Sequence, residues 1–153
     1  MVGISGGIDS AVTAYLLKNR GFNVEGVHLS LTRWDDHEQL LRIRKISKVL
    51  DINVHRMERN AEFSRKVIQP FMRDYFNGIT PNPCVICNPS FKFEALFEMA
   101  CSFGGEMVST GHFARISCSG QRAMIARAMD HSKDQSYMLY RLPPEYLSRT
   151  ILP

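Results

Sequence analysis

The chain has 153 residues with 44% hydrophobic and 22% charged side chains, the balance of one globular domain large enough to bury a core. Its formal net charge of +4 permits a polyanionic partner without requiring one. No run of eighteen apolar residues occurs, which excludes a transmembrane helix, and the N-terminus lacks the features of a signal peptide. We therefore expect the four cysteines to be thiols in a reducing compartment rather than a disulfide framework.

The sequence opens with a short apolar stretch, residues 1–4, followed by the motif SGGIDS at residues 5–10 and a predicted helix over residues 9–19. Adjacent glycines allow a tight turn and a close approach of the backbone to a ligand. A helix N-terminus carries free N–H groups and partial positive charge, which suits a phosphate group. The Walker A pattern is absent. Two interpretations stay open, an anion site and a plain strand-to-helix turn with a good N-cap.

Strand and helix patterns then alternate along the chain. Strands are predicted over residues 22–29, 51–57 and 106–110, and helices around residues 40–50, 60–76 and 90–102. Pro70 should kink or split its helix. A polar linker is expected over residues 31–37, a hairpin within residues 115–129, a last helix toward Tyr140 and a short helix at residues 143–147. The alternation predicts an α/β fold, a doubly wound parallel sheet with helices on both faces.

Basic side chains gather on one face of the predicted helix around residues 40–50. A solvated helix face explains them, and contact with a nucleic-acid backbone is the alternative. They are Arg42, Arg44, Lys45 and Lys48.

The stretch TPNPCVICNP at residues 80–89 holds a CxxC pair, Cys84 and Cys87, among three prolines. The prolines are expected to prevent a regular element there. Because the pair precedes a predicted helix, the pKa of these thiols should be lowered and the thiols reactive. Buried structural thiols and half a zinc site are the alternatives, although no second pair supplies further zinc ligands. Cys101 and Cys118 are expected to be structural or incidental.

Five motifs occur together in one order: SGGIDS, TPNPCVICN, FKF, STGHFAR and SKDQSYMLYRL. With them the chain resembles the N-terminal catalytic domain of the tRNA-specific 2-thiouridylases, members of the ATP pyrophosphatase (PP-loop) superfamily. The resemblance implies an adenine nucleotide alpha hydrolase-like domain over residues 1–153. The start of its first strand and the later domains of the family are expected to lie outside this sequence.

The resemblance also implies an activity, ATP-dependent sulfur transfer to the wobble uridine of tRNA. ATP would adenylate the uracil C2 oxygen, and persulfide sulfur would replace it. Cys87 matches the first catalytic cysteine of the family. The residues that match its ATP site are Ser5, Gly6, Gly7, Ile8, Asp9, Ser10, Leu29 and Gly111. Those that match its contacts with tRNA or the target base are Asn82, Pro83, Cys84, His112, Lys133, Asp134 and Gln135.

The cofactors implied are ATP and Mg²⁺, with Asp9 helping to hold either the loop or the magnesium ion, and no metal site built from protein side chains alone. A disulfide between Cys84 and Cys87 is expected when sulfur is released, and an iron–sulfur cluster is possible but not favoured. The implied partners are tRNA and a persulfide sulfur-carrier protein or cysteine desulfurase, with no membrane. The expected location is the bacterial cytoplasm, or the mitochondrial matrix in a eukaryote.

Two other functions stay open at this point. One is a different PP-loop ligase or amidotransferase that acts on a small molecule. The other is an ATP-binding module of the same family that has lost catalysis.

Overall fold

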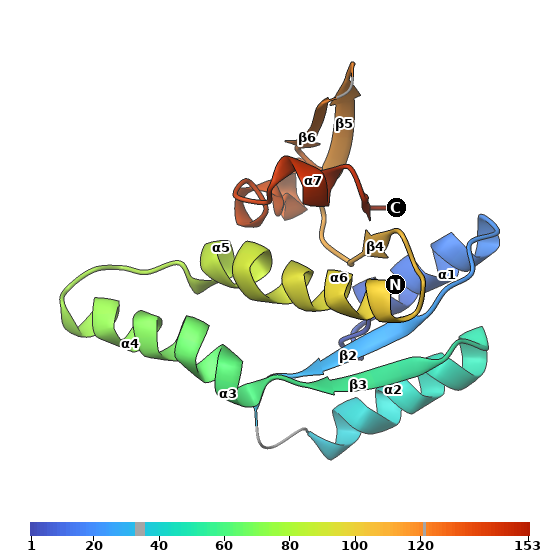
Figure 1. The fold of residues 1–153 in the computed structure, drawn as a ribbon, viewed down its shortest axis with the longest axis horizontal. Coiled ribbons are helices and arrows are strands. Elements are labelled where there is room, and N and C mark those ends of the chain that lie inside the picture. The colour runs from blue at the N-terminus through green and yellow to red at the C-terminus, as the bar shows by residue number, and fades with distance from the viewer. Residues whose placement is uncertain (33–35, 121) are drawn as a thin grey trace.

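A parallel sheet forms the centre of the molecule (Figure 1). The computed structural model describes residues 1–32, 36–120 and 122–153. In these parts of the chain the sheet has five strands in the order β3-β2-β1-β4-β7, and every neighbouring pair is parallel. The strands are β1 (Val2–Gly3), β2 (Gly26–Ser30), β3 (Val54–Glu58), β4 (Val108–Ser109) and β7 (Thr150–Ile151).

Helices cover both faces of this sheet, which confirms the predicted fold class. On one face, α1 (Ile8–Asn19) and α2 (His37–Leu50) bury Ala14, Leu17 and Ile43 against β1. On the other face, α6 (Phe93–Ser102) buries Phe93 and Leu96 completely. Apolar residues at helical spacing on these helices therefore fill two cores, one on each side of the sheet. No helix in the described parts of the chain is long and apolar enough to cross a membrane.

Local signals set the bounds of α2 and β2. The Asp36 carboxylate accepts a hydrogen bond from the Glu38 amide at 3.1 Å and begins α2, and Asp51, with a φ of 48°, ends it. The predicted strand at residues 22–29 starts only at Gly26. Its partner β1 begins at Val2, which pairs with Gly26, so the earlier residues have no neighbouring strand there. The centre of the predicted polar linker, residues 33–35, lies outside the described residues.

The predicted helix over residues 60–76 continues past Pro70 instead of splitting. It comprises α3 (Asn60–Phe63), the π-helical turn η1 (Ser64–Ile68) and α4 (Gln69–Phe76). The Gln69 amide bonds to the carbonyl of Ser64, five residues back. The widened turn sits where Pro70 has no N–H to donate, so the helix absorbs the proline without a break.

The prediction that prolines prevent a regular element at residues 80–89 is wrong. Here α5 (Pro83–Cys87) runs through a second π-helical turn, η2 (Asn88–Lys92), into α6. Pro83 occupies the first helical position, where an N–H is not needed. Around Pro89 the side chains of Ser90 and Asn88 donate to the carbonyls of Ile86 (2.6 Å) and Cys84 (2.9 Å).

The C-terminal third contains the predicted hairpin, formed by β5 (Arg115–Ser119) and β6 (Arg122–Ala126), which projects from the sheet (Figure 1). The predicted last helix is instead two 3-10 turns, η3 (His131–Lys133) and η4 (Ser136–Met138). Asp134 separates them because its carboxylate accepts from the Ala128 amide at 2.8 Å and the Ser136 hydroxyl at 2.7 Å. The short helix α7 (Pro144–Leu147) was expected, whereas β7 was not.

Candidate active site

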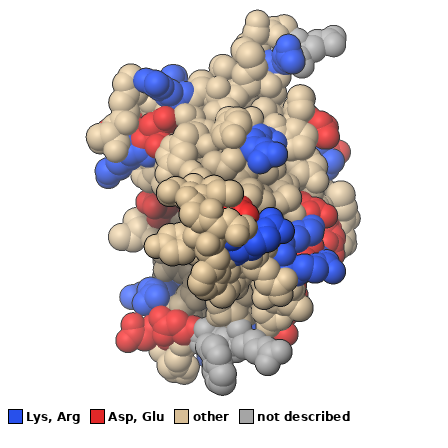
Figure 2. Space-filling view, turned by 90° about the vertical axis from the view of Figure 1, so that its left-hand side faces the viewer, with Lys and Arg blue, Asp and Glu red and all other residues tan. Residues whose placement is uncertain are grey.

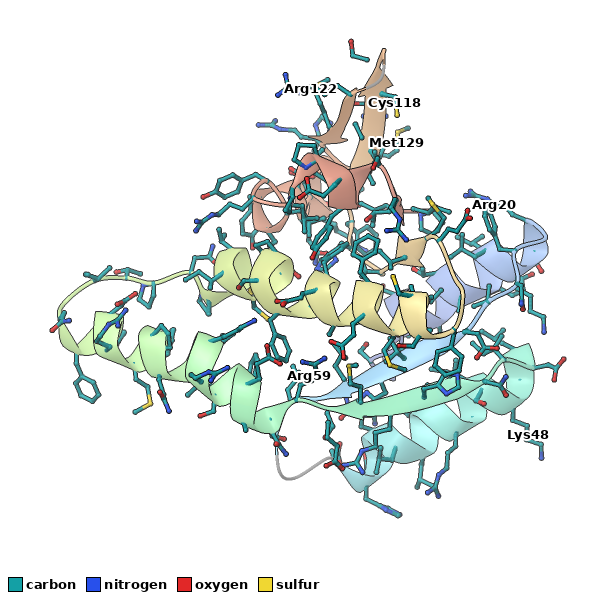
Figure 3. All side chains as sticks on the ribbon, viewed as in Figure 1. Arg20, Lys48, Arg59, Cys118, Arg122 and Met129 are labelled. Atoms are coloured by element: carbon teal, nitrogen blue, oxygen red, sulfur yellow. The ribbon has the colours of Figure 1, made fainter. Side chains whose placement is uncertain are left out.

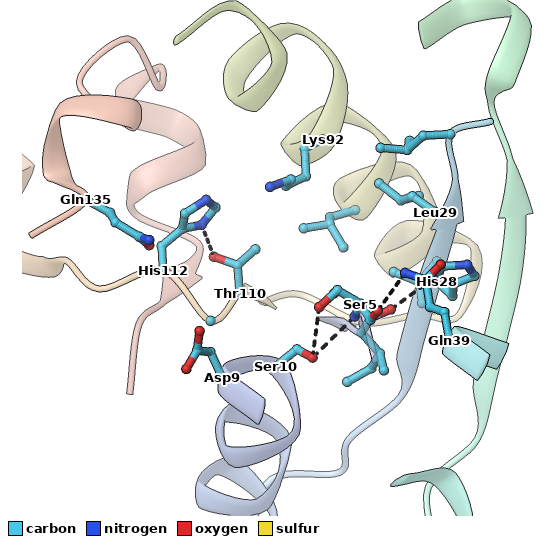
Figure 4. A pocket seen from close by; sticks show the side chains of 16 residues that line it. Ser5, Asp9, Ser10, His28, Leu29, Gln39, Lys92, Thr110, His112 and Gln135 are labelled. Carbon is cyan, nitrogen blue, oxygen red and sulfur yellow. Dashed lines mark hydrogen bonds between the residues drawn. The ribbon is translucent and has the colours of Figure 1, made fainter. Parts of the chain in front are cut away.

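A cavity of about 380 Å³ opens beyond the C-terminal ends of β1 and β4, the size of a small-molecule site (Figure 4). The crossover to β2 starts after β1 on one side, and the chain returns through β4 on the other, so this is where the strand order reverses. Parallel α/β sheets bind ligands at such switch points. Ile4 and Ser5 follow β1, and Thr110, Gly111 and His112 follow β4.

The turn between β1 and α1 is braced by its own serines. The Ser10 hydroxyl donates to the Gly7 carbonyl at 2.9 Å and lies 3.3 Å from the Ser5 hydroxyl. Gly7 is the N-cap of α1, and in the described residues no side chain caps the helix. The alternative of a plain turn with a good N-cap lacks the side-chain cap that it requires, and the first amides of α1 are left for another acceptor. This is the arrangement that an anion site requires.

The same turn is also held from α2. The side-chain amide of Gln39 donates to the Ser5 carbonyl at 2.8 Å. Gly6 has a φ of +83°, a conformation that favours glycine, and a Cβ there would lie 3.2 Å from the Gln39 carbonyl oxygen. A side chain at Gly6 would thus strain the backbone and crowd α2, so the turn keeps its shape only with glycine.

Gly111 packs directly on the first turn of α1. A Cβ at Gly111 would come within 2.8 Å of the Asp9 carbonyl carbon. The next residue, His112, has its Nδ1 2.8 Å from the Thr110 hydroxyl and its ring stacked on Phe93. Burial, with a smaller contribution from Lys92, lowers the pKa of His112 to about 3, so its imidazole is neutral near pH 7.

The thiol of Cys87 lies on the helix that forms the opposite wall of the site. Lys92, one π-helical turn further along, lines the cavity, and its ammonium interacts electrostatically with Cys87, Cys84 and His112. The wider turn places residues five apart on the same side of the helix. Cys84 and Cys87 themselves are not among the described residues that line the cavity; Lys92, which interacts with both thiols, is the link between the CxxC segment and the cavity.

Two expectations for the CxxC pair are corrected. Burial raises the pKa of Cys87, and the charge of Lys92 lowers it by less. Cys87 lies at the end of α5, not at a helix N-terminus, so the expected lowering is absent. The predicted disulfide is not supported, since Cys84 and Cys87 are both free thiols. Residues one turn apart on a helix have Cβ atoms about 5–6 Å apart, beyond the roughly 4 Å of a disulfide.

The remaining cysteines lie outside the site. Cys101 is near the end of α6, and Cys118 lies on the projecting hairpin (Figure 3). Both are exposed free thiols. Within the described residues no three His, Cys, Asp or Glu side chains gather in a way that could hold a metal ion.

The structure brings together some of the predicted site residues and leaves others apart. Ile8, Gly6 and Gly7 line a neighbouring apolar groove between α1 and α2, and Asn82, Pro83 and Cys84 begin α5. Those that line the cavity are Ser5, Asp9, Ser10, Leu29, Gly111, His112 and Gln135.

The triplet at residues 133–135 makes contacts within the protein. Lys133 lies over the Phe113 ring, with its Nζ 5.7 Å from the ring centroid. Asp134 holds the two 3-10 turns in place, as described above, and the backbone amide of Gln135 donates to the Phe113 carbonyl at 2.7 Å. The fold thus fixes this triplet beside the end of β4.

Nine of the sixteen described residues that line the cavity were not predicted as site residues, among them Lys92, Gln39 and Thr110. Lys92 belongs to the FKF motif, and its spacing of five from Cys87 was the available signal. Gln39 reaches the turn only because α2 packs over it, and Thr110 looks like an ordinary strand residue. No local pattern marks these two.

Known proteins resemble this chain over its whole length. The family model described as "tRNA methyl transferase HUP domain" matches residues 1–153. A tRNA-specific 2-thiouridylase MnmA 2 of Clostridium botulinum is 42% identical over 156 residues, covering 98% of this chain and 44% of that protein. A tRNA-specific 2-thiouridylase MnmA of Nitratiruptor sp. is 43% identical over 155 residues, covering 100% and 44%.

The chain thus spans less than half the length of the relatives that it matches. Among solved structures, an NMN synthetase from Francisella tularensis is similar with a TM-score of 0.48 and 20% identity, covering 71% of this chain and 42% of that one. The match of the family model over the whole chain decides the assignment. This chain belongs to the tRNA methyl transferase HUP domain family, as the HUP domain of the tRNA 2-thiouridylases.

Proposed function

We propose that the protein is an ATP-dependent tRNA sulfurtransferase that forms 2-thiouridine at the wobble position. One observation carries the proposal: a phosphate-binding type of turn and a CxxC helix border the same cavity, joined by Lys92. ATP binding follows from membership of the HUP domain family. Relatives that are 42–43% identical over this domain are named tRNA-specific 2-thiouridylases.

The first chemical step is adenylation. The uracil C2 oxygen attacks the α-phosphorus of ATP, the new O–P bond forms, and the bond to the β-phosphate breaks with release of pyrophosphate. The exposed amides of α1 and the hydroxyl of Ser5 bind the phosphates, and Ser10, which donates to the Gly7 carbonyl, holds the turn that presents them. Asp9 is the one carboxylate among the described cavity residues, and one carboxylate plus substrate phosphates is a usual setting for Mg²⁺.

The second step is sulfur transfer. The terminal sulfur of a donor persulfide attacks C2, the C2–O bond breaks, and AMP leaves with the electron pair. The Cys87 thiolate then attacks the remaining donor sulfur, so that a Cys87–donor disulfide forms and the sulfur stays on C2 as the thiocarbonyl. A thiolate is the right nucleophile for this exchange. The donor is a persulfide-bearing carrier protein or a cysteine desulfurase.

Contact with tRNA is assigned to the rim of the cavity. Asn82, Pro83 and Cys84 begin the helix that carries Cys87, and residues 133–135 lie across from it beside β4. On the face toward α4 and α5, positive and negative side chains are mixed (Figure 2). Ion pairs such as Lys66–Glu62 and Lys66–Glu94 neutralise part of the positive charge. We therefore assign the rim, rather than a broad basic surface, to recognition of the base.

The experiment separates the two steps. ATP/pyrophosphate exchange with tRNA reports adenylation, and mass spectrometry of the digested tRNA reports 2-thiouridine after a persulfide donor is added. Cys87→Ser should keep exchange and lose thiolation. Cys118→Ser, on the exposed hairpin, is the matched control and should keep both.

Full thiolation by Cys87→Ser would refute the role of this thiol. Nucleotide binding without exchange would favour an ATP-binding module. Exchange with a small-molecule acceptor in the absence of tRNA would favour another PP-loop ligase.

A further inference from the structure

One positively charged side chain lines the cavity. Among the sixteen described residues that surround it, Lys92 is the only lysine or arginine (Figure 4). His112 is neutral near pH 7, because burial lowers its pKa to about 3. Among these residues, the Lys92 ammonium is therefore the single full positive charge available to an anion bound in the cavity, besides any metal ion bound with that anion.

That charge is held without a counter-ion. No hydrogen bond or ion pair is made by the Lys92 ammonium within the described parts of the chain, whereas Lys66 on the neighbouring helix bonds Glu62 at 2.8 Å and Glu94 at 3.0 Å. Burial lowers the pKa of Lys92. A half-buried ammonium without a partner in the described residues gains most from an anionic ligand, because the ligand replaces the hydration that the site has removed.

The position of Lys92 distinguishes between the phosphates of ATP. In Figure 4, Lys92 points into the cavity from the helix on one side, and Ser5 and Ser10 lie with the turn on the other. The turn with the open end of α1 suits the β- and γ-phosphates. The base must lie toward Cys87, where sulfur arrives. In adenylation the uracil oxygen attacks the α-phosphorus while its bond to the β-phosphate breaks, so the α-phosphate lies between the turn and the helix.

We propose that Lys92 is a catalytic residue whose ammonium binds the α-phosphate of ATP, of the adenylated base and of the departing AMP. This inference rests on the proposed function. In adenylation Lys92 stabilises the added negative charge at the α-phosphorus. In sulfur transfer it stabilises the AMP phosphate oxygen that takes the electron pair of the broken C2–O bond. A positive charge that is already held where negative charge develops stabilises the transition state efficiently.

The test uses three ligands that differ in the phosphate they carry. Calorimetry measures the affinity for AMP, adenosine and inorganic pyrophosphate in the wild type, Lys92→Met, Lys92→Arg and the control Lys48→Met. Lys48 is exposed on the outer side of α2 (Figure 3). In Lys92→Met the affinity for AMP should fall about 10- to 100-fold, the usual effect of losing a charge-assisted hydrogen bond. Affinities for adenosine and pyrophosphate should stay unchanged, and Lys92→Arg should recover most of the AMP affinity.

Several outcomes would overturn the assignment. Equal AMP affinity in wild type and Lys92→Met would remove Lys92 from the phosphate site. A parallel loss of adenosine affinity would show a structural role. The pKa of Cys87 can be measured by the pH dependence of its alkylation. If this pKa rises in Lys92→Met while the AMP affinity is unchanged, Lys92 acts on the Cys87 thiol and not on the phosphate. Loss of AMP affinity in Lys92→Met together with no pyrophosphate exchange in the wild type would instead uphold the phosphate contact and refute the proposed reaction.

Discussion

Replacing Gly111 by alanine tests the close contact between the end of β4 and the first turn of α1. The new Cβ would lie 2.8 Å from the Asp9 carbonyl carbon and 3.0 Å from both its Cβ and its carbonyl oxygen. All three atoms belong to the start of α1, and two of them are backbone atoms that cannot rotate away. The first turn of α1 must therefore move away from His112 to make room.

The size of the effect follows from this overlap. Adding one carbon to a well-packed contact typically costs about 1–3 kcal/mol in the free energy of unfolding. For a domain of this length, each kcal/mol lowers the melting temperature by about 2–4 °C, so Gly111→Ala should melt roughly 2–12 °C lower. Because the displaced turn carries the proposed phosphate site, pyrophosphate should also bind more weakly.

The assay pairs thermal unfolding with pyrophosphate calorimetry. Gly105→Ala is the matched control: its new Cβ would lie 3.4 Å from the Ala100 carbonyl oxygen, an ordinary contact, and its backbone is not in the left-handed region. The control should differ from the wild type by less than about 0.5 kcal/mol. If Gly111→Ala melts and binds pyrophosphate like the wild type, the contact does not position the site.

Two further predictions concern His112 and Asn88. The pKa of His112 is about 3 in the folded protein and 6.5 in the reference state, so the folded state binds the proton less tightly and stability falls as the pH drops from 6.5 toward 3. The loss should be about 1–2 kcal/mol by pH 5, and urea unfolding of His112→Asn should lack that part of the pH dependence; an identical pH dependence would contradict the assignment. Asn88 is buried, and its side-chain amide donates to the carbonyls of Cys84 (2.9 Å) and Met138 (3.2 Å). Asn88→Ala should lower the free energy of unfolding by about 1–3 kcal/mol in urea denaturation and speed alkylation of Cys87, whereas unchanged stability would show that these bonds do not hold the CxxC helix.

The sheet was predictable because its evidence is local. Apolar strands and amphipathic helices alternate along the chain, and the helix predicted over residues 9–19 ends at Asn19 as expected. β7 was missed because a strand of two residues shows no periodicity. Thr150 and Ile151 become a strand only by pairing with β4, a contact that joins residues about forty apart.

The site was only partly predictable, for a related reason. Ser5 and Gly111 stood out by their motifs, and both line the cavity. Lys92 did not, because its direction depends on a π-helical turn. In that turn the side chains of Asn88 and Ser90 donate hydrogen bonds to backbone carbonyls near Pro89. A rule that treats proline as a helix breaker does not take these replacement hydrogen bonds into account.

The π-helical turn before α6 lies between two parts of one continuous helix, the part packed in the core and the part that carries the two thiols. Phe93 and Leu96 anchor α6 in the core, whereas Cys84 and Cys87 sit upstream of the extra residue. Deleting one residue from this segment would swing both thiols by about 100° around the helix axis. The sheet and its two cores would persist, but the two thiols would no longer lie on the same side of the helix as Lys92. The extra residue of the π-helical turn thus sets the orientation of the two thiols, whereas the packing of α6 in the core stays the same.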